Sequence, residues 1–557
     1  MRHTTIFTFS LIVGIAFWAG PAHAQKKSDN TFETNQAIGI FSNILKEINT
    51  FYVDTPDVEK MVQEGLNAML YTLDPYTTYI PETESDDFKF MTTGEYGGIG
   101  ALIGKLDSFT YITEPYEGLP AQIKGLKAGD KILRIDSVDT KGLESDKVSN
   151  CLRGTANTIV RVTVERAETL DTLTFDIVRR KITLPAVPYY GVRDGGVGYI
   201  YLQSFTDKAA AEVKEAFLDL KKNHHISSLI LDLRGNPGGI LDEALTIINY
   251  FVPKGVEVLS TRSRTGRWDR TYKTTQKPID TQIPITVLIN RESASASEIV
   301  SGTLQDLDRA VIVGERSYGK GLVQSTRPLP YNGLLKVTTS KYYIPSGRSI
   351  QAIDYSHRNA DGQAERIPDS LTTAYTTAGG RIVRDGGGIT PDVKIELPQV
   401  ANIVYYLMRD MHIFRYANRF CAHNDSIVPI DRFVITDEIY DDFKTYIKSK
   451  NFKYDRRSEK ILDELKKSME FEGYYTEAEA EINALAQKLS HNLDRELDNF
   501  RREISEQLAL EIVKRYYYQK GEIVESLKND AIVQRAEDIL RNTQEYNTIL
   551  HPTPEKK

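Results

Sequence analysis

Cysteine is nearly absent from this sequence, which has only Cys151 and Cys421 among its 557 residues. Two cysteines so far apart in the chain form neither a disulfide framework nor a zinc site. A basic excess is also missing, because the net charge is −7, and this argues against a nucleic-acid-binding protein. We therefore expect no metal, no other cofactor and no nucleic acid among the ligands.

Long apolar runs are missing from the whole chain beyond its first 24 residues. Near the start, Arg2 and His3 precede an apolar run over residues 6–18, and residues 22–24 (Ala-His-Ala) form a small-x-small cleavage site. This run is short for a membrane span, and no cysteine follows it to carry a lipid anchor. The pattern predicts a signal peptide over residues 1–24 and an exported, soluble mature protein, periplasmic or extracellular.

Ser295 lies in a run of small residues and is followed three positions later by Glu298, which is the spacing of a capping box. The apolar residues 283–289 before it predict a buried strand, and helical spacing follows over residues 299–307. Ser295 is thus expected at a loop-to-helix junction, where free backbone N–H groups can stabilise an oxyanion. The alternative is that Ser295 serves only as an N-cap.

Lys320 follows 25 residues later, between two glycines and after a second apolar run over residues 309–314. One helix, a turn and a strand fit in this interval and could return the lysine to the serine. To act as a base Lys320 must be neutral, which requires burial to lower its pKa from about 10.4. The alternative is a solvated lysine in a turn.

Two other chemistries are disfavoured. The segment from Gly314 to Lys320 matches most of a phosphate-binding loop, but Gly321 replaces the required Ser or Thr and residues 322–326 look extended rather than helical. We therefore expect no nucleotide. A Ser–His mechanism is an alternative, yet none of the candidate histidines (His224, His225 and His357) has a glycine-framed setting like that of Lys320.

Two glycine-rich turns are candidate binding elements. The apolar strand predicted at residues 229–234 ends in Gly235-Asn236-Pro237-Gly238-Gly239. The amide of Gly238 or Gly239 is a candidate oxyanion donor beside that of Ala296, although a tight turn explains these glycines as well. The second turn comprises Gly97, Gly98, Ile99 and Gly100, which could form a nest for a carboxylate or simply begin a strand.

The pattern of hydrophobic residues changes along the chain. It is helical over residues 31–71, strand-like with glycine turns over 94–180, alternating between strands and helices over 198–398, and helical again from residue 400. Alternation of this kind favours an α/β core. A capping box at Thr476 and Glu479, with apolar residues at helical spacing up to Gly521, predicts one long helix with Gly521 as its C-cap. Residues 354–387 are interpreted as a polar surface insertion.

The chain resembles the carboxyl-terminal processing peptidases, also called tail-specific proteases, over about residues 31–398. The resemblance is carried chiefly by residues 293–299 and 314–324. Further matches are residues 73–75, 231–239, 343–348 and 388–392. The resemblance implies that Ser295 is the nucleophile, that Lys320 is the general base and that Gln324 orients the lysine.

The same resemblance implies an α/β multidomain protein with an α/β serine-peptidase core and a β-rich PDZ-like domain. The PDZ domain would capture the C-terminal carboxylate of a substrate, and Arg153 would link it to control of the active site. We predict a signal peptide (1–24), a helical N-terminal region (25–90), a PDZ domain (91–181), a peptidase core (182–399) and a helical C-terminal domain (400–557).

These inferences together predict an exported serine endopeptidase that acts on proteins with exposed C-terminal tails. The alternative is a non-catalytic PDZ-bearing chaperone or scaffold, which would bind tails without turnover. Either way the partners are proteins or peptides with exposed C-termini, and assembly into a homo-oligomer or with an adaptor stays open.

Overall fold

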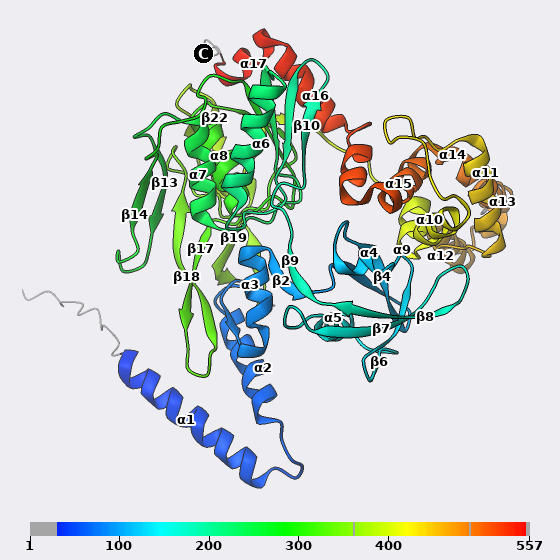
Figure 1. Cartoon of the computed structure of the whole chain (residues 1–557), viewed down its shortest axis with the longest axis horizontal. Coiled ribbons are helices and arrows are strands. Elements are labelled where there is room, and N and C mark those ends of the chain that lie inside the picture. Colours follow the sequence, from blue (N-terminus) through cyan, green and yellow to red (C-terminus); the bar gives the residue numbers. More distant parts are fainter. Residues whose placement is uncertain (1–29, 360–361, 490–491, 553–557) are drawn as a thin grey trace, which may run out of the picture. The chain divides into compact units, whose positions relative to one another are not determined.

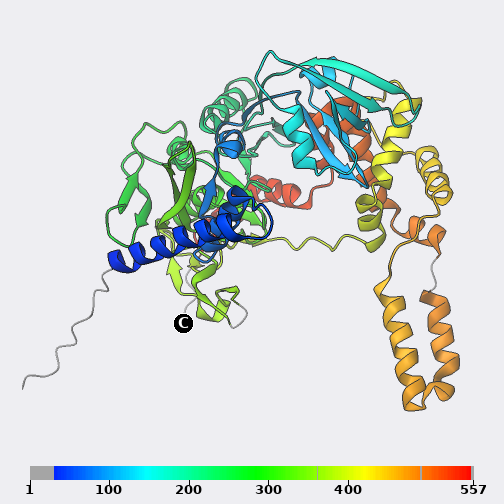
Figure 2. The ribbon, with the colours of Figure 1, turned by 90° about the horizontal axis from the view of Figure 1, so that it is seen from below.

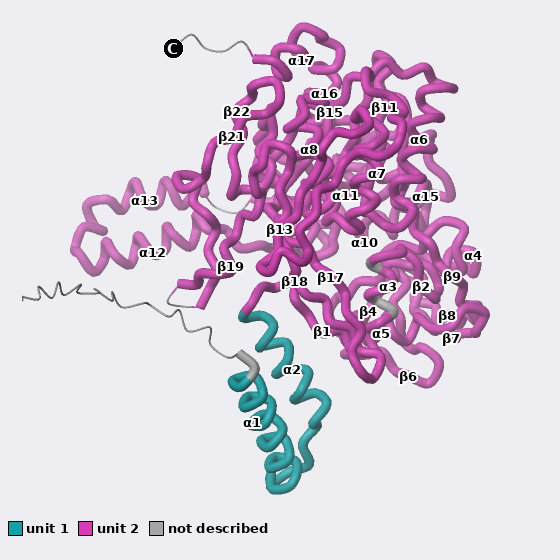
Figure 3. Tube along the Cα trace, turned by 90° about the vertical axis from the view of Figure 1, so that its left-hand side faces the viewer, with its two compact units in different colours: residues 1–72 teal, residues 73–557 magenta. Residues whose placement is uncertain are grey.

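The computed structural model describes residues 30–359, 362–489 and 492–552, and the predicted signal peptide lies outside them. The chain divides into two compact units, residues 1–72 and 73–557 (Figure 3). In the first unit, the described residues form α1 (Asn30–Phe51) and α2 (Val58–Tyr71), as the helical spacing predicted. Asp57 caps α2 by accepting a hydrogen bond from the N–H of Lys60.

A six-stranded sheet forms the centre of the second unit, and its strands lie in the order β10-β11-β12-β15-β16-β23. All neighbours pair in parallel except β10 and β11. The bounds are β10 (Tyr189–Arg193), β11 (Val197–Tyr201), β12 (Ser228–Asp232), β15 (Ile285–Ile289), β16 (Val311–Gly314) and β23 (Val393–Lys394). The predicted α/β core and its three apolar strands are therefore confirmed.

Both faces of this sheet are covered, because alternate side chains of each strand point to opposite sides. One face packs against α6 (Ala209–Asn223), α7 (Leu241–Phe251) and α8 (Ala296–Asp306), which lie together in Figure 1. The other face packs against α16 (Ala531–Arg541) and α17 (Thr543–Leu550). The core thus recruits helices from far beyond residue 399, where we predicted its end.

A second sheet carries the segment that follows Lys320. Its strands are β1 (Thr78–Ile80), β13 (Glu257–Arg262), β14 (Arg270–Lys273), β17 (Leu322–Pro328) and β18 (Leu334–Tyr343). The order is β1-β18-β13-β14, and β17 also pairs with β18. The polar stretch that follows is not irregular, since it forms the hairpins β19–β20 (Ile353–Arg358, Ala364–Arg366) and β21–β22 (Ala374–Thr376, Ile382–Arg384).

The glycine-rich region predicted to be PDZ-like folds as a small β-domain with its own apolar core. Its sheet comprises β3 (Ala101–Leu106), β4 (Phe109–Pro115), β5 (Lys131–Ile135), β6 (Val138–Asp139), β7 (Ile159–Glu165) and β8 (Thr172–Val178). Three helices, α3 (Ser85–Thr93), α4 (Pro120–Ile123) and α5 (Ser145–Leu152), and the strand pair β2 (Glu95–Gly98) and β9 (Arg180–Thr183) accompany this sheet. In the sheet order β3 lies at an edge, next to β4.

The region after residue 400 is helical, as predicted, and has a separate apolar core. Its helices are α9 (Asn402–Arg409), α10 (His412–His423), α11 (Asp437–Ser449), α12 (Arg457–Glu472), α13 (Tyr475–Leu489), α14 (Leu493–Asn499) and α15 (Arg501–Ser526). Figure 2 shows α12 and α13 side by side as a hairpin. None of the helices in the described ranges is long and apolar enough to span a membrane.

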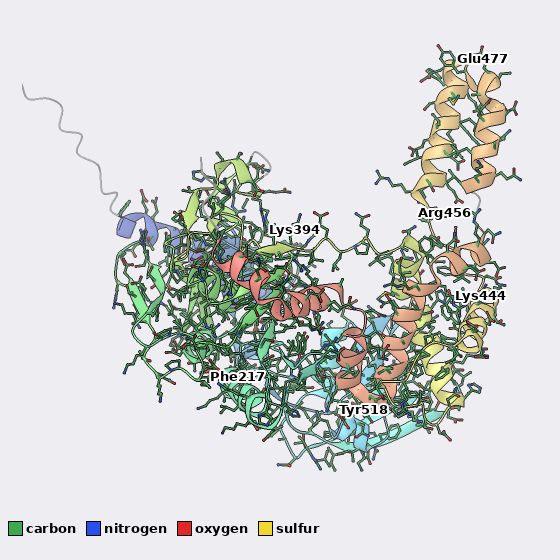
Figure 4. The ribbon with its side chains drawn as sticks, turned by 90° about the horizontal axis from the view of Figure 1, so that it is seen from above. Phe217, Lys394, Lys444, Arg456, Glu477 and Tyr518 are labelled. Carbon is green, nitrogen blue, oxygen red and sulfur yellow. The ribbon has the colours of Figure 1, made fainter. Side chains whose placement is uncertain are left out.

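The prediction of one long helix ending at Gly521 is wrong. Three helices, α13, α14 and α15, replace it, and α13 begins before Thr476, which is therefore not its N-cap. Gly521 lies inside α15, three residues after a kink at Tyr518 (φ 53°, ψ −158°; labelled in Figure 4). A Cβ atom at Gly521 would lie 2.3 Å from Cβ of Tyr517, so close packing rather than capping explains this glycine.

Candidate active site

Ser295 lies between β15 and α8 and is the N-cap residue of α8, as the sequence predicted. Its backbone has a positive φ angle (φ 54°, ψ −111°), which is unusual for a residue other than glycine. Ser293 and Ser297 are fully buried, and their hydroxyls donate to the carbonyls of Leu233 and Asn236. Of these three serines, only Ser295 is partly exposed.

Lys320 lies in the loop between β16 and β17, and two shared partners join this loop to Ser295. The N–H groups of Ser295 and Lys320 donate to the same oxygen, Oε2 of Glu298, at 2.9 and 2.8 Å. On the other side, Oη of Tyr342 donates to the carbonyl oxygens of Lys320 (2.7 Å) and Ser295 (3.3 Å). The two residues singled out from the sequence are thus brought together.

Glu298 has a larger role than the capping function deduced from the sequence. Its side chain is fully buried and also accepts hydrogen bonds from the Ser317 hydroxyl and the Gly319 N–H. Burial raises the pKa of Glu298, and these hydrogen bonds oppose that rise. A single buried carboxyl group therefore fastens the serine loop to the lysine loop. The Ser-x-x-Glu spacing indicated its position but not its contacts with the lysine loop.

The pKa of Lys320 is lowered to about 8, chiefly by burial and also by the positive charge of Lys336, while Asp74 and Glu298 act in the opposite direction. The Lys320 ammonium lies 4.3 Å from the ring centroid of Tyr76, a cation–π arrangement that favours the charged form. Within the described residues, Ser295 Oγ and Lys320 Nζ share no hydrogen bond. Such bonds are often long in substrate-free enzymes and tighten when substrate binds.

Tyr76 is a site residue that sequence reasoning missed. Oδ1 of Asp74 accepts hydrogen bonds from the N–H groups of Tyr76 (2.8 Å) and Thr77 (2.7 Å), which fixes the turn before β1. The motif at residues 73–75 marked the position, but nothing local indicated that the next ring faces the lysine.

Gln324 lies on β17, and its side-chain amide donates to Oγ1 of Thr338 at 3.2 Å. In the part of the chain that the structure describes, it makes no hydrogen bond to Lys320. Its role in orienting the lysine therefore stays a prediction.

The glycine turn after β12 packs directly against the serine. A Cβ atom at Gly238 (φ 100°) would lie 2.8 Å from Cβ of Ser295 and 2.9 Å from N of Ala296, so only glycine fits there. The Gly238 N–H already donates to Oδ1 of Asn236 at 2.8 Å. Among the described residues, neither Gly239 nor Ala296 has an acceptor for its N–H, which leaves these two as the candidate oxyanion donors.

Arg234, at the start of this turn, joins it to the end of the chain. Its guanidinium pairs with the buried Asp232 and, at 2.7 Å, with Asp530. Asp530 also caps α16 by accepting hydrogen bonds from the N–H groups of Ile532 and Val533. The candidate oxyanion turn is therefore braced by a helix that follows it by some 300 residues of chain.

The second glycine turn lines a cavity of about 250 Å³ between β3 and α5, which also borders Leu152 and Arg153. The carbonyls of Ile99 and Gly100 accept hydrogen bonds from Ala121 (2.8 Å) and Tyr116 (3.0 Å). Within the described residues no acceptor takes the N–H of Ile99 or Gly100, so both can donate to an anion.

The other two predicted residues of this turn have different surroundings. Gly97 allows close approach of the chain, since a Cβ atom there would lie 2.1 Å from the carbonyl oxygen of Gly154. Gly98 lines the cavity with Ile99 and Gly100. The Arg153 guanidinium lies 5.4 Å from the ring centroid of Tyr96. All the predicted carboxylate-binding residues are thus at or beside one cavity.

Three family models match the chain. The model of peptidase family S41 matches residues 196–356, a PDZ domain model matches residues 111–166, and the model of a probable PDZ-protease C-terminal helical domain matches residues 403–540. These ranges fall on the α/β core, the small β-domain and the helical region.

Curated relatives agree with these matches. A carboxy-terminal-processing protease of Bartonella bacilliformis is 37% identical over 329 residues, which cover 58% of this chain and 75% of the relative. A probable CtpA-like serine protease of Staphylococcus aureus is 32% identical over 350 residues, or 62% and 68% of the two chains.

Among solved structures, the photosystem II D1 C-terminal processing protease is similar, with 25% identity, a TM-score of 0.36 and coverage of 64% of this chain and 92% of that one. By its sequence relatives and its core, the chain belongs to peptidase family S41, the carboxy-terminal-processing serine proteases.

Proposed function

We propose that this protein is an exported endopeptidase that cleaves proteins recognised by their C-terminal tails, with Ser295 as nucleophile and Lys320 as general base. The observation that carries the proposal is the joint anchoring of both residues by Glu298, together with a Lys320 pKa of about 8. A lysine with its ordinary pKa would be protonated near neutral pH and could not accept a proton.

In the first step, the neutral Lys320 amine takes the proton from Ser295 Oγ as this oxygen attacks the scissile carbonyl carbon. The carbonyl oxygen becomes an oxyanion, which the N–H groups of Ala296 and Gly239 stabilise. Lys320 then gives its proton to the leaving amine, and the peptide bond breaks. The resulting ester on Ser295 is hydrolysed by a water that Lys320 deprotonates, which restores the free enzyme.

For this chemistry the Lys320 side chain must turn from the Tyr76 ring toward Ser295. Leaving the ring removes a contact that favours the ammonium form. Bound substrate excludes water from the site, which lowers the pKa of the lysine further. We infer that Gln324, four residues further along the chain, orients the amine in this position.

Tail recognition is assigned to the cavity between β3 and α5. The free N–H groups of Ile99 and Gly100 would bind the terminal carboxylate, and the tail would pair with β3, the edge strand. Apolar side chains of the tail would enter the cavity beside Leu152. Arg153, which also borders the cavity, would report its occupancy to the active site.

Export is inferred from residues 1–24 alone, which have the pattern of a cleaved signal peptide. The rival function, a PDZ-bearing chaperone without catalysis, is not favoured by membership of a peptidase family. It predicts binding of tails with no turnover.

The test is digestion of a peptide library with varied C-termini by the wild type, Ser295→Ala and Lys320→Met. We expect cleavage to fall by at least about 1,000-fold in both variants. Lys341→Met, an exposed lysine of β18, is the matched control and should cleave normally. A serine-directed reagent should label Ser295 and neither Ser293 nor Ser297. Normal cleavage by Ser295→Ala would refute the proposal.

A further inference from the structure

The helical region contacts the PDZ domain through a partly buried lysine on α15. Nζ of Lys514 lies 3.1 Å from Oε2 of Glu114 and 2.9 Å from Oε2 of Glu522. The side chains of Lys514 and Glu114 are only 18% and 7% exposed. An ion pair so well shielded from water is screened far less than one at the surface.

Glu114 lies directly behind the proposed tail-binding strand. It is on β4, opposite Leu102 of the edge strand β3, and the next residue pair is Pro115 with Ala101. Two residues after Glu114, the N–H of Tyr116 holds the carbonyl of Gly100. A shift of β4 would therefore move both the edge strand and the carboxylate-binding turn.

Glu114 depends on Lys514 for its charge balance. Burial raises the pKa of Glu114, Lys514 is the cation that opposes this, and Oε1 of Glu114 has no hydrogen-bond partner among the described residues. Without Lys514 the carboxyl group would be left buried and unpaired, which is strongly unfavourable. The carboxyl group would then either take up a proton or move toward water, and a movement toward water would displace β4 as well.

Further contacts join the two regions at the same place. Nε2 of Gln122, on α4, donates to the hydroxyl of Tyr518 at 3.1 Å, and Tyr518 is the kinked residue of α15. Asn418 of α10 packs so closely on Gly129 that a Cβ atom there would lie 2.2 Å from its amide nitrogen. Arg515, next to Lys514, donates to that same asparagine at 2.7 Å. The helices thus hold the back of the PDZ domain in a defined geometry.

We propose that Lys514 is a positioning residue for substrate recognition, which acts through Glu114 and β4 to keep the carboxylate-binding turn in its binding shape. This inference rests on the proposed function of that turn. The helical region then sets the affinity for C-terminal tails. It does not set the chemistry at Ser295, because the ion pairs of Lys514 within the described residues are with Glu114 and Glu522.

The first experiment measures the affinity of the full-length Ser295→Ala protein for a fluorescent apolar peptide with a free C-terminal carboxylate. The same peptide with a C-terminal amide is the probe control. We expect Lys514→Met to weaken binding of the free acid about tenfold and Lys514→Arg to keep it within about threefold. Lys520→Met, an exposed lysine on the same helix, should bind like the parent.

The second experiment uses the active enzyme. Lys514→Met should raise KM for tailed substrates about tenfold, with kcat and the rate of Ser295 labelling unchanged. The double variant Lys514→Met with Glu114→Gln should weaken tail binding by less than the product of the two single effects, because it no longer has the buried negative charge of Glu114. Should Lys514→Met fail to fold, the double variant still tests the coupling, because it leaves no unpaired charge.

The outcomes separate this inference from the function on which it rests. In one outcome, Lys514→Met and Lys520→Met bind the free-acid peptide equally well, and the parent protein still prefers the free acid over the amide. This outcome would overturn the role of Lys514 but not tail recognition. A parent protein that binds acid and amide equally would overturn tail recognition itself and this inference with it.

Discussion

Two buried glutamates illustrate different ways of building a functional site. Glu298 accepts four hydrogen bonds, all from the peptidase core, and neither of its oxygens lacks a partner. Glu114 relies on one lysine from the helical region, and one of its oxygens has no partner among the described residues. The reacting groups are therefore fixed within one core, whereas the proposed tail-binding site depends on a neighbouring part of the chain.

The largest expected effect is that of Glu298→Ala. Four donors, two of them fully buried, would lose their acceptor, at about 1–3 kcal/mol for each one left buried and unpaired, so we expect a loss of several kcal/mol in stability and at least about 1,000-fold in kcat/KM. Since this variant could unfold, Glu298→Gln is the second test. It keeps the size but presents an NH₂ group to donors, and should still lose about 100-fold. Chemical denaturation and peptide cleavage measure both quantities, and full activity of Glu298→Gln would contradict the anchoring role.

The next effect is that of pH on catalysis. Only the neutral amine of Lys320 is a base, so kcat/KM should rise about tenfold per pH unit on the acid side of its pKa of about 8 and level off above it. Lys336→Met removes a positive charge that lowers this pKa, and should move the profile to higher pH. A profile that is flat from pH 6 to 9, or one that Lys336→Met moves to lower pH, would contradict a lysine base.

A smaller effect is expected from Tyr342→Phe. This change removes the hydroxyl that binds the carbonyls of Lys320 and Ser295, so we expect about 1–2 kcal/mol lower stability and about tenfold lower kcat. KM for tailed substrates should stay the same, because the PDZ domain is not touched. Tyr343→Phe, the next residue of β18, is the control. If both variants lose kcat equally, the hydroxyl of Tyr342 has no special part.

The smallest effect is that of Glu114→Gln. The variant keeps the shape of the side chain and leaves Lys514 paired with Glu522, so we expect only about threefold weaker binding of a free C-terminal peptide. Cleavage of a short substrate without a recognised tail should not change. A loss of activity on both kinds of substrate would remove the contrast between the two glutamates. Fluorescence titration and a cleavage assay provide the two readings.

Much of the active site could be predicted because its signals are local. Ser295 and Lys320 are each framed by small residues and each follows an apolar strand, and parallel strands of one sheet bring their C-terminal ends to the same edge. Tyr76 and Tyr342 could not be found in this way. Tyr76 lies far before Ser295 in the chain, in the turn that leads into a strand of the other sheet, and only tertiary packing shows which way its ring faces.

The helical region shows the limit of periodic patterns. The apolar residues between positions 476 and 521 are divided among three helices, because α13 pairs with α12 whereas α14 and α15 pack into the core of the helical region. Glycine is the residue type typical of a helix C-cap, but position 521 lies inside a helix. Glycine is needed there because Tyr517 leaves no room for a side chain. Nothing in the spacing indicated that α16 and α17 would cover a sheet whose strands end far earlier in the chain.

That late covering has a consequence for how the enzyme matures. Ser295 and Lys320 are synthesised well before α16 and α17. Until these two helices follow, one apolar face of the sheet is exposed and Arg234 lacks its ion pair with Asp530. We expect a ribosome-bound chain stopped after residue 526 to be inert, in contrast to the released full-length chain. The peptidase core would thus be completed only after the PDZ domain and the helical region have been synthesised, because α16 and α17 follow both in the chain.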